Sequence, residues 1–310
     1  MASAVNEEYI SLLLVAAVSL AAPLLFAAIG ELISERAGVI NIELEGMMLV
    51  GAFTGVWGAY LSGSVWVGFL AAAAGGLLVA LIHGVMCFVF LANQVVSGVV
   101  LNILALGLTS FGLDAVFGSS LNRSVGTLDR VRIPMLAEIP FVGPALFSQR
   151  LTVYVAILLV PTTWWLLNRT ASGLALKSAG ERPDAAEALG VRVMLVRWVA
   201  LMACGILAGI GGGQLTLAGL GFFTPNVTAG RGFIALAAVV FGKWNPIGAA
   251  AAVLLFATAD AFQIRAQALG IDLPYQLLVS LPYLATLIAL AGLLRKMRPP
   301  AALGINYLPD

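Results

Sequence analysis

The feature that most constrains this chain is a series of long apolar runs along nearly its whole length. A transmembrane helix needs about 20 mostly apolar residues. Nine runs are candidates: residues 9–29, 42–61, 65–91, 95–117, 151–167, 193–217, 232–241, 247–262 and 275–294. The run 232–241 is too short to cross as a straight helix, so it is a half-helix or is joined to its neighbours through 242–246. The pattern predicts an all-α polytopic membrane protein with about nine transmembrane segments.

The composition supports a membrane location. Hydrophobic residues make up 61% of the chain and charged residues 10%, against about 45–50% and 25% in soluble domains. A soluble core of this length could not bury so much apolar surface, so we expect membrane lipid around the chain. The net charge of +1 gives no basic surface for a nucleic acid. We expect residues 1–310 to form one integral membrane domain.

Two polar connections separate the runs, at 118–150 and 168–192. With nine spans, one side of the membrane carries ten of the sixteen basic residues: Arg36, Arg169, Lys177, Arg182, Arg192, Arg197, Lys243, Arg295, Lys296 and Arg298. The other side carries Arg123, Arg130, Arg132, Arg150, Arg231 and Arg265. Since basic residues favour the cytoplasm, loop 118–150 is predicted outside and loop 168–192 inside. The N-terminus is then outside and the C-terminus cytoplasmic.

Few residues could support metal or covalent chemistry. His83 is the one histidine, and the two cysteines, Cys87 and Cys204, lie in apolar runs. A metal site built from such residues needs three or four ligands, so we expect neither a metal site nor a disulfide. The nearest approach to a nucleotide-binding loop, at Gly242–Lys243, continues into Trp244. Hydrolase motifs are also absent from the sequence, so we expect a chain that is not an enzyme and binds no cofactor.

A short helix is predicted inside loop 168–192. Residues 179–190 read AGERPDAAEALG. Proline suits the first helical position, acids suit the first turns, and glycine suits the position after the end. The segment is either an ordinary surface helix or a helix that inserts into a groove on a cytoplasmic partner. The candidate docking residues are Arg182, Pro183, Asp184, Ala186, Glu187 and Gly190. Because it has no wide apolar stripe, we expect a partner to contribute to its stability.

This segment resembles the coupling helix of bacterial ABC-importer permeases of the branched-chain amino acid and ribose class. Residues 30–52, 92–98 and 224–242 resemble the nucleoside and simple-sugar branch of that class; they read GELISERAGVINIELEGMMLVGA, ANQVVSG and TPNVTAGRGFIALAAVVFG. The resemblance covers nearly the whole chain and implies a type II importer-like permease in the bacterial cytoplasmic membrane. The expected substrate is a nucleoside, with a simple sugar or a flavin-like vitamin as alternatives.

The resemblance also implies partners. These are a second permease subunit, commonly a different chain, a cytoplasmic ABC ATPase and an extracytoplasmic substrate-binding lipoprotein. ATP and magnesium would bind to the ATPase. This agrees with the lack of a nucleotide-binding loop in the chain itself.

Polar residues within apolar runs are candidates for a substrate pathway, because they are costly in lipid and usually face a cavity or one another. The candidates are Asn41, Glu45, Asn93, Gln94, Ser97, Asn102, Phe222, Asn226 and Phe233. Glu43 lies beside the first two, where a broken helix or a short turn with solvated acids would both fit. The amides near 93–102 line a pathway or join neighbouring helices. Residues 222–233 would form the start of a half-helix whose N-terminal amides and aromatic side chains face a cavity, or they would take part in ordinary core and interface packing.

One other class of transporter competes with this interpretation. An ion-coupled secondary transporter would need a titrating group in the middle of the membrane. Asp114 and Asp260 are the nearest candidates, and both lie near predicted outer ends of their runs. We therefore favour the ATP-driven permease.

Overall fold

The computed structural model describes residues 2–118, 124–140, 142–268 and 298–308. Within these ranges, seven helices are long and apolar enough to cross a membrane. They are built from α1 (Ala2–Arg36), α2 (Leu44–Ser62), α3 (Val65–Gly84) with the π-helical η1 (Val85–Val89), α4 (Gln94–Phe117), α6 (Leu151–Arg169), α9 (Val193–Leu215) with the π-helical η3 (Thr216–Leu220), and α11 (Pro246–Ala268). A short apolar helix, α10 (Arg231–Phe241), follows η3. The polytopic helical class is confirmed, whereas the predicted run 275–294 lies outside the described residues and the count of nine is not established.

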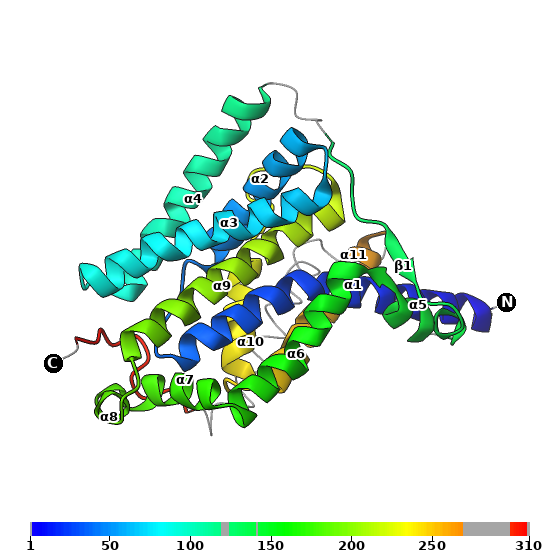
Figure 1. The fold of residues 1–310 in the computed structure, drawn as a ribbon. Coiled ribbons are helices and arrows are strands. Elements are labelled where there is room, and N and C mark those ends of the chain that lie inside the picture. Colours follow the sequence, from blue (N-terminus) through cyan, green and yellow to red (C-terminus); the bar gives the residue numbers. More distant parts are fainter. Residues whose placement is uncertain (1, 119–123, 141, 269–297, 309–310) are drawn as a thin grey trace.

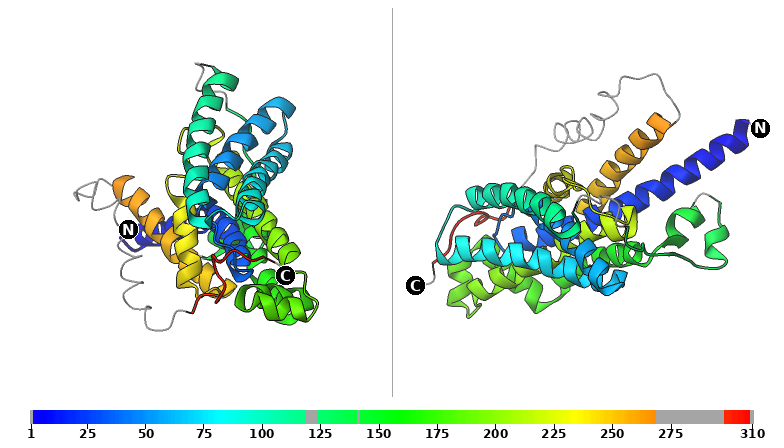
Figure 2. Two further views of the ribbon diagram at one scale, coloured as in Figure 1. Left: turned by 90° about the vertical axis from the view of Figure 1, so that its left-hand side faces the viewer. Right: turned by 90° about the horizontal axis from the view of Figure 1, so that it is seen from above.

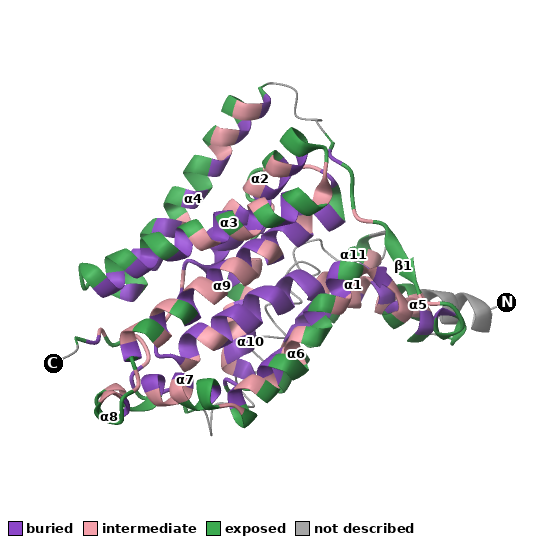
Figure 3. Ribbon diagram, viewed as in Figure 1, coloured by how far each residue is buried: buried purple, intermediate pink, exposed green. Residues whose placement is uncertain are grey.

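The helices pack around α9, which contacts α1, α2 and α3 (Figures 1 and 2). Phe26, Leu32, Met48, Leu201 and Leu217 are among the buried side chains of this core. Figure 3 shows buried residues concentrated on α1 and α9, while α4 and α6 present mainly exposed residues. Val96, Ile103 and Phe111 of α4 are exposed. Such apolar outer faces suit a chain surrounded by lipid, where exposed leucine-like side chains carry no penalty.

Small residues allow the central helices to approach closely. A Cβ atom on Gly209 would lie 2.2 Å from the Ala72 carbonyl oxygen, and one on Gly212 would lie 1.8 Å from the Met48 carbonyl oxygen. No side chain fits at such distances, so these contacts of α9 with α3 and α2 require glycine. Lipid offers little hydrophobic drive for helix association, and close backbone packing replaces it.

Loop 118–150 contains more structure than the sequence indicates. It forms β1 (Arg130–Arg132), η2 (Leu136–Glu138), α5 (Val142–Phe147) and β2 (Ser148–Arg150). The two strands pair antiparallel, with Arg130 opposite Arg150. Figure 1 places this small folded region at the end of the bundle opposite α7 and α8.

Loop 168–192 forms two helices, α7 (Ala171–Glu181) and α8 (Pro183–Ala188). The predicted α8 is confirmed, although it ends one residue before the expected Leu189. Pro183 occupies its first position, and Gly190 takes a φ of 86° beyond its end. Helix α7 was not predicted. Its start is set by Thr170, whose hydroxyl accepts a hydrogen bond from the Gly173 amide.

Residues 298–308, here called the C-terminal strap, cross the end of the bundle next to α7 and α8. Hydrogen bonds join Ala302 N to Gly180 O (2.8 Å), Gly304 N to Gly38 O (3.0 Å), Asn306 Nδ2 to Leu91 O (2.7 Å) and Arg197 Nη1 to Ile305 O (2.8 Å). The Tyr307 hydroxyl contacts the Glu187 carboxylate of α8. The strap therefore connects α7 and α8 to α9 and to the segments before α2 and α4.

Candidate functional site

The first element of the site is the short helix α10, whose N-terminus is held by Glu45 of α2. The Glu45 carboxylate accepts hydrogen bonds from Thr228 Oγ1 (2.5 Å), Gly230 N (2.8 Å) and Gly232 N (2.6 Å). These amides belong to the group that every helix leaves unpaired at its start. Glu45 is only 8% exposed. One of the two alternatives for this segment had these amides facing a cavity; in the structure they bind the Glu45 carboxylate instead.

Helix α10 begins inside the bundle. The segment between α1 and α2 turns back inward, where Asn41 N donates to Glu31 Oε1 (3.2 Å), so the first turn of α2 lies deeper than the end of α1. At the other end of α10, Trp244 O accepts from Arg36 Nε, the last residue of α1 (2.9 Å). Eleven residues span about 16 Å. The geometry therefore matches the predicted half-helix.

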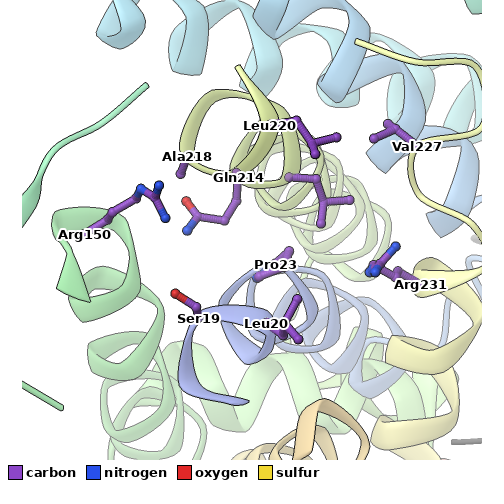
Figure 4. Close-up of a pocket in the computed structure, with 11 residues that line it drawn as sticks. Ser19, Leu20, Pro23, Arg150, Gln214, Ala218, Leu220, Val227 and Arg231 are labelled. Carbon is purple, nitrogen blue, oxygen red and sulfur yellow. The ribbon is translucent and has the colours of Figure 1, made fainter. Parts of the chain in front are cut away.

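A cavity of about 210 Å³ lies beside this half-helix. It is lined by Ser19, Leu20 and Pro23 of α1, by Arg150 before α6, by Gln214, Leu215, Ala218, Gly219 and Leu220 of α9 and η3, and by Val227 and Arg231 (Figure 4). The lining is mostly apolar with a few convergent polar side chains, which is the usual character of a ligand site. Loop 118–150 reaches it through Arg150.

A helix-internal proline, a π-helical segment and the start of a short helix border the cavity. Pro23 lies inside α1, η3 is a π-helical continuation of α9, and α10 is a half-helix that starts at Arg231. Interrupted helices near the middle of the bundle are typical of transporter substrate sites, because they leave polar groups to face a bound molecule.

Two polar side chains of the cavity have unused hydrogen-bonding capacity. Gln214 is 5% exposed, and its Oε1 atom has no partner among the described residues. Arg150 donates from Nε to the Leu128 carbonyl oxygen (3.0 Å), while its Nη atoms have no acceptor within the part of the chain that the structure describes. Burial, together with Arg130, lowers the pKa of Arg150. By contrast, Arg231 pairs with Asp260 at 3.3 Å.

The amides predicted for a pathway act mainly as connectors. Asn93 caps α4, its Oδ1 accepting from Val95 N and Val96 N. Gln94 Oε1 accepts from Ile40 N (2.8 Å). Asn102 Oδ1 accepts from Gly46 N (2.7 Å) while its Nδ2 donates to Ile42 O (2.9 Å). These bonds join α4 to the segment that begins α2. A transport role for these residues stays a prediction.

The acids near the start of α2 are buried rather than solvated. Asn41 and Glu43 are fully buried, and His83 Nδ1 lies 3.0 Å from Glu43 Oε1 and 3.2 Å from Ser97 Oγ. Burial raises the pKa of Glu43, while the hydrogen bond to His83 opposes that shift. The acids are therefore not solvated, and residues 37–43 form an irregular connection between α1 and α2. A position of this segment beside a substrate pathway or an ATPase stays a prediction.

The residues predicted around 222–233 do not gather at one point. Phe222 is partly buried, Asn226 is exposed with a φ of 56°, and Phe233 is 48% exposed on α10. Phe223, which the predicted group omits, packs edge to face against Phe53 at 5.4 Å. None of the nine predicted pathway residues lines the cavity described above.

The docking candidates on α8 divide into two faces. Arg182, Asp184 and Gly190 are exposed, and Pro183 is partly buried. Ala186 is 3% exposed and packs in a cluster with Ala179, Val193 and Tyr307. Ala186 therefore packs on its own chain and is not exposed as a docking residue would be. That a partner contributes to the stability of α8 stays a prediction. The supporting contacts come from the C-terminal strap, about 120 residues away, which local sequence does not reveal.

One feature of the sequence does point to the cavity. Gln214 is the sole amide in the apolar run 193–217, and intramembrane polar residues usually have a function. Arg150 and Ser19 gave no such signal, because a basic residue at a loop end and a serine in a span are both common.

A bundle of membrane-spanning helices with a half-helix and a mostly apolar cavity that holds a few polar side chains is typical of a membrane transport protein. The chain belongs to the family described as branched-chain amino acid transport system / permease component, which it matches over residues 13–291. It is thus a permease subunit of an ABC transporter.

Several permeases resemble this chain over most of its length. The guanosine ABC transporter permease protein NupQ of Bacillus subtilis is 39% identical over 97% of this chain and 98% of its own length. The nucleoside ABC transporter permease protein NupC of Lactococcus lactis is 38% identical over 92% and 93%. TsgC13 of Haloferax volcanii, named provisionally as a glucose ABC transporter permease protein, is 41% identical over 84% and 79%.

All three organisms have a second, weaker relative of this chain under a matching name. In Haloferax volcanii it is the glucose ABC transporter permease protein TsgB13, 26% identical over 76% of this chain and 65% of its own length. Guanosine ABC transporter permease protein NupP of Bacillus subtilis is 25% identical over 75% of the chain and 68% of its own length. Nucleoside ABC transporter permease protein NupB of Lactococcus lactis is 23% identical over 76% and 67%. Permeases of this family thus occur as two different subunits with one named substrate.

Proposed function

We propose that this chain is the membrane subunit through which a nucleoside enters the cell in an ATP-driven importer. The observation that carries the substrate is the 38–39% identity to guanosine and nucleoside permeases over more than nine-tenths of each chain. A simple sugar is the second candidate, favoured by the 41% identity to TsgC13 over a shorter stretch. The mostly apolar cavity favours a planar base over a hydroxyl-rich sugar.

Three partners would complete the transporter, one within the bacterial inner membrane and one on each side of it. A second permease subunit is supported by the paired relatives NupQ and NupP, and NupC and NupB. A cytoplasmic ATPase would hold ATP and magnesium, and a lipoprotein would deliver the substrate from outside. In this arrangement loop 118–150 faces the lipoprotein, and α7, α8 and the C-terminal strap face the ATPase.

The contacts of α8 suit a coupling element. Its buried face is fixed by Ala186 and by the bond between Glu187 and Tyr307. Its other face leaves Arg182, Asp184 and Leu189 exposed, Leu189 by 86%. Because the strap also bonds to α9 and to the segments before α2 and α4, a displacement of α8 would be transmitted to the spans.

Uptake by the complete transporter tests the substrate. Proteoliposomes are made from both permeases and the ATPase, with ATP in the lumen and the lipoprotein outside. They should accumulate labelled guanosine. Labelled glucose should not accumulate. Glucose uptake without guanosine uptake would reverse the order of the two candidates.

Substitution at the tip of α8 tests the coupling. Leu189→Arg should lower recovery of the permease on a tagged ATPase, because it replaces an exposed apolar side chain at the proposed contact with a charged one. The matched control is Met135→Arg, since Met135 is 84% exposed. It lies between β1 and η2 in the chain, and Figure 1 places β1 and α5 at the opposite end of the bundle from α8. Equal recovery of both variants would argue against docking at α8.

A further inference from the structure

We infer that the cavity between α1, α9 and α10 is a subsite for the base of the transported nucleoside, with Arg150 and Gln214 contacting its polar edge. The inference rests on the proposed function and assigns one part of the substrate to named side chains. The size of the cavity supports a site for part of a nucleoside. Its volume of about 210 Å³ is below the roughly 300–1,000 Å³ of pockets that enclose a drug-sized ligand. The cavity would hold a base and leave the sugar outside it.

The unpaired atom of Gln214 indicates a ligand with a donor. Its side chain is almost fully buried, yet Oε1 has no partner among the described residues. A buried acceptor without a partner is rare in folded proteins and calls for an explanation. An N–H group on a bound base would supply the missing hydrogen bond.

Arg150 supplies the complementary donors. Its Nε atom is engaged by Leu128 O, which fixes the guanidinium and leaves both Nη groups free of described acceptors. Figure 4 shows the polar ends of the Arg150 and Gln214 side chains pointing toward one another, away from Val227 and Arg231. A guanidinium fork matches a pair of acceptors such as O6 and N7 of guanine, the arrangement that arginine uses on guanine in DNA. Guanine offers N–H donors on the adjacent edge.

The remaining lining suits the faces of a flat ring. Leu20, Pro23, Leu215, Leu220 and Val227 are apolar and come from three different segments. Arg231 is neutralised by Asp260, and Ser19 donates to Gln149 Oε1 (3.0 Å). The unsatisfied polar capacity is thus confined to Arg150 and Gln214, on one side of an otherwise apolar space.

The test compares guanosine with 7-deazaguanosine, in which carbon replaces the N7 acceptor. Uptake kinetics are measured with the complete transporter for the parent, Arg150→Gln, Arg150→Lys and Gln214→Leu. Arg130→Gln is the control, because Arg130 faces Arg150 across the β1–β2 pair but does not line the cavity. The lipoprotein is identical throughout, so its own preference contributes the same factor to every ratio. Complex recovery and lipoprotein-stimulated ATP hydrolysis show which variants assemble.

We expect the parent to prefer guanosine in kcat/KM, and both Arg150 variants to reduce that preference by about tenfold, the effect of one lost hydrogen bond to a charged group. Lysine keeps the charge but not the fork, so Arg150→Lys remains informative if Arg150→Gln does not assemble. Gln214→Leu should lower kcat/KM for both nucleosides alike.

The outcomes separate the two proposals. If the parent transports no nucleoside, the proposed function is wrong. If the parent transports guanosine and the preference is unchanged in an assembled Arg150 variant, or Gln214→Leu transports like Arg130→Gln, the base subsite is wrong while the proposed function stands.

Discussion

The contact between Glu45 and α10 gives the sharpest stability prediction. In Glu45→Gln, the amide oxygen can replace the carboxylate oxygen that accepts from Thr228 and Gly230, but the amide NH₂ then faces Gly232 N. One buried N–H loses its acceptor, at a cost of about 1–3 kcal/mol. The surviving bonds also weaken, because charge-assisted hydrogen bonds are roughly twice as strong as neutral ones. We expect a total loss of about 2–4 kcal/mol.

Two measurements check this prediction. The apparent melting temperature of the purified permease should fall by about 4–8 °C, taking roughly 2 °C per kcal/mol for a large chain. Hydrogen–deuterium exchange should speed up at the first amides of α10 more than elsewhere. The matched control is Glu138→Gln, since Glu138 is exposed and pairs loosely with Arg132 at 3.9 Å. If both variants melt together and exchange at α10 is unchanged, Glu45 does not anchor the half-helix.

Two further predictions concern packing and topology. Gly212→Ala should destabilise the permease by about 1–3 kcal/mol or more, since its Cβ would meet the Met48 carbonyl oxygen at 1.8 Å. The control is Gly107→Ala, whose Cβ meets nothing within 4 Å and which should melt like the parent. Equal melting temperatures for the two variants would contradict the close packing. In intact cells an impermeant maleimide should label Glu138→Cys but label Asp184→Cys only after permeabilisation, because loop 118–150 is predicted outside and loop 168–192 inside. Both native cysteines are buried and should give little background labelling. The opposite pattern would invert the predicted topology.

The sequence predicted those parts of the structure that depend on neighbours along the chain. Helix α8 was predicted because proline, acids and glycine act within one or two turns. The half-helix α10 was predicted because a run of ten apolar residues cannot span a bilayer. The docking and pathway roles assigned to these segments stay predictions.

Long-range contacts account for what the sequence did not reveal. The placement of Glu45 against α10 joins residues more than 180 positions apart, and the burial of Ala186 depends on Tyr307. The cavity likewise collects side chains from α1, the start of α6, η3 and α10. No periodicity within one segment indicates which of its polar residues will meet those of another.

The C-terminal strap has a consequence for biosynthesis. The ribosome synthesises the strap after every described helix. The spans therefore enter the membrane before the strap can form hydrogen bonds with them. Until then the carbonyl groups of Gly38, Leu91 and Gly180, and the buried Arg197, lack the partners that the strap provides. A chain cut short before the strap would insert its helices and still leave these groups unpaired at the end that carries α7 and α8. Synthesis of residues 298–308 is thereby a condition for a fully hydrogen-bonded surface at this end of the bundle.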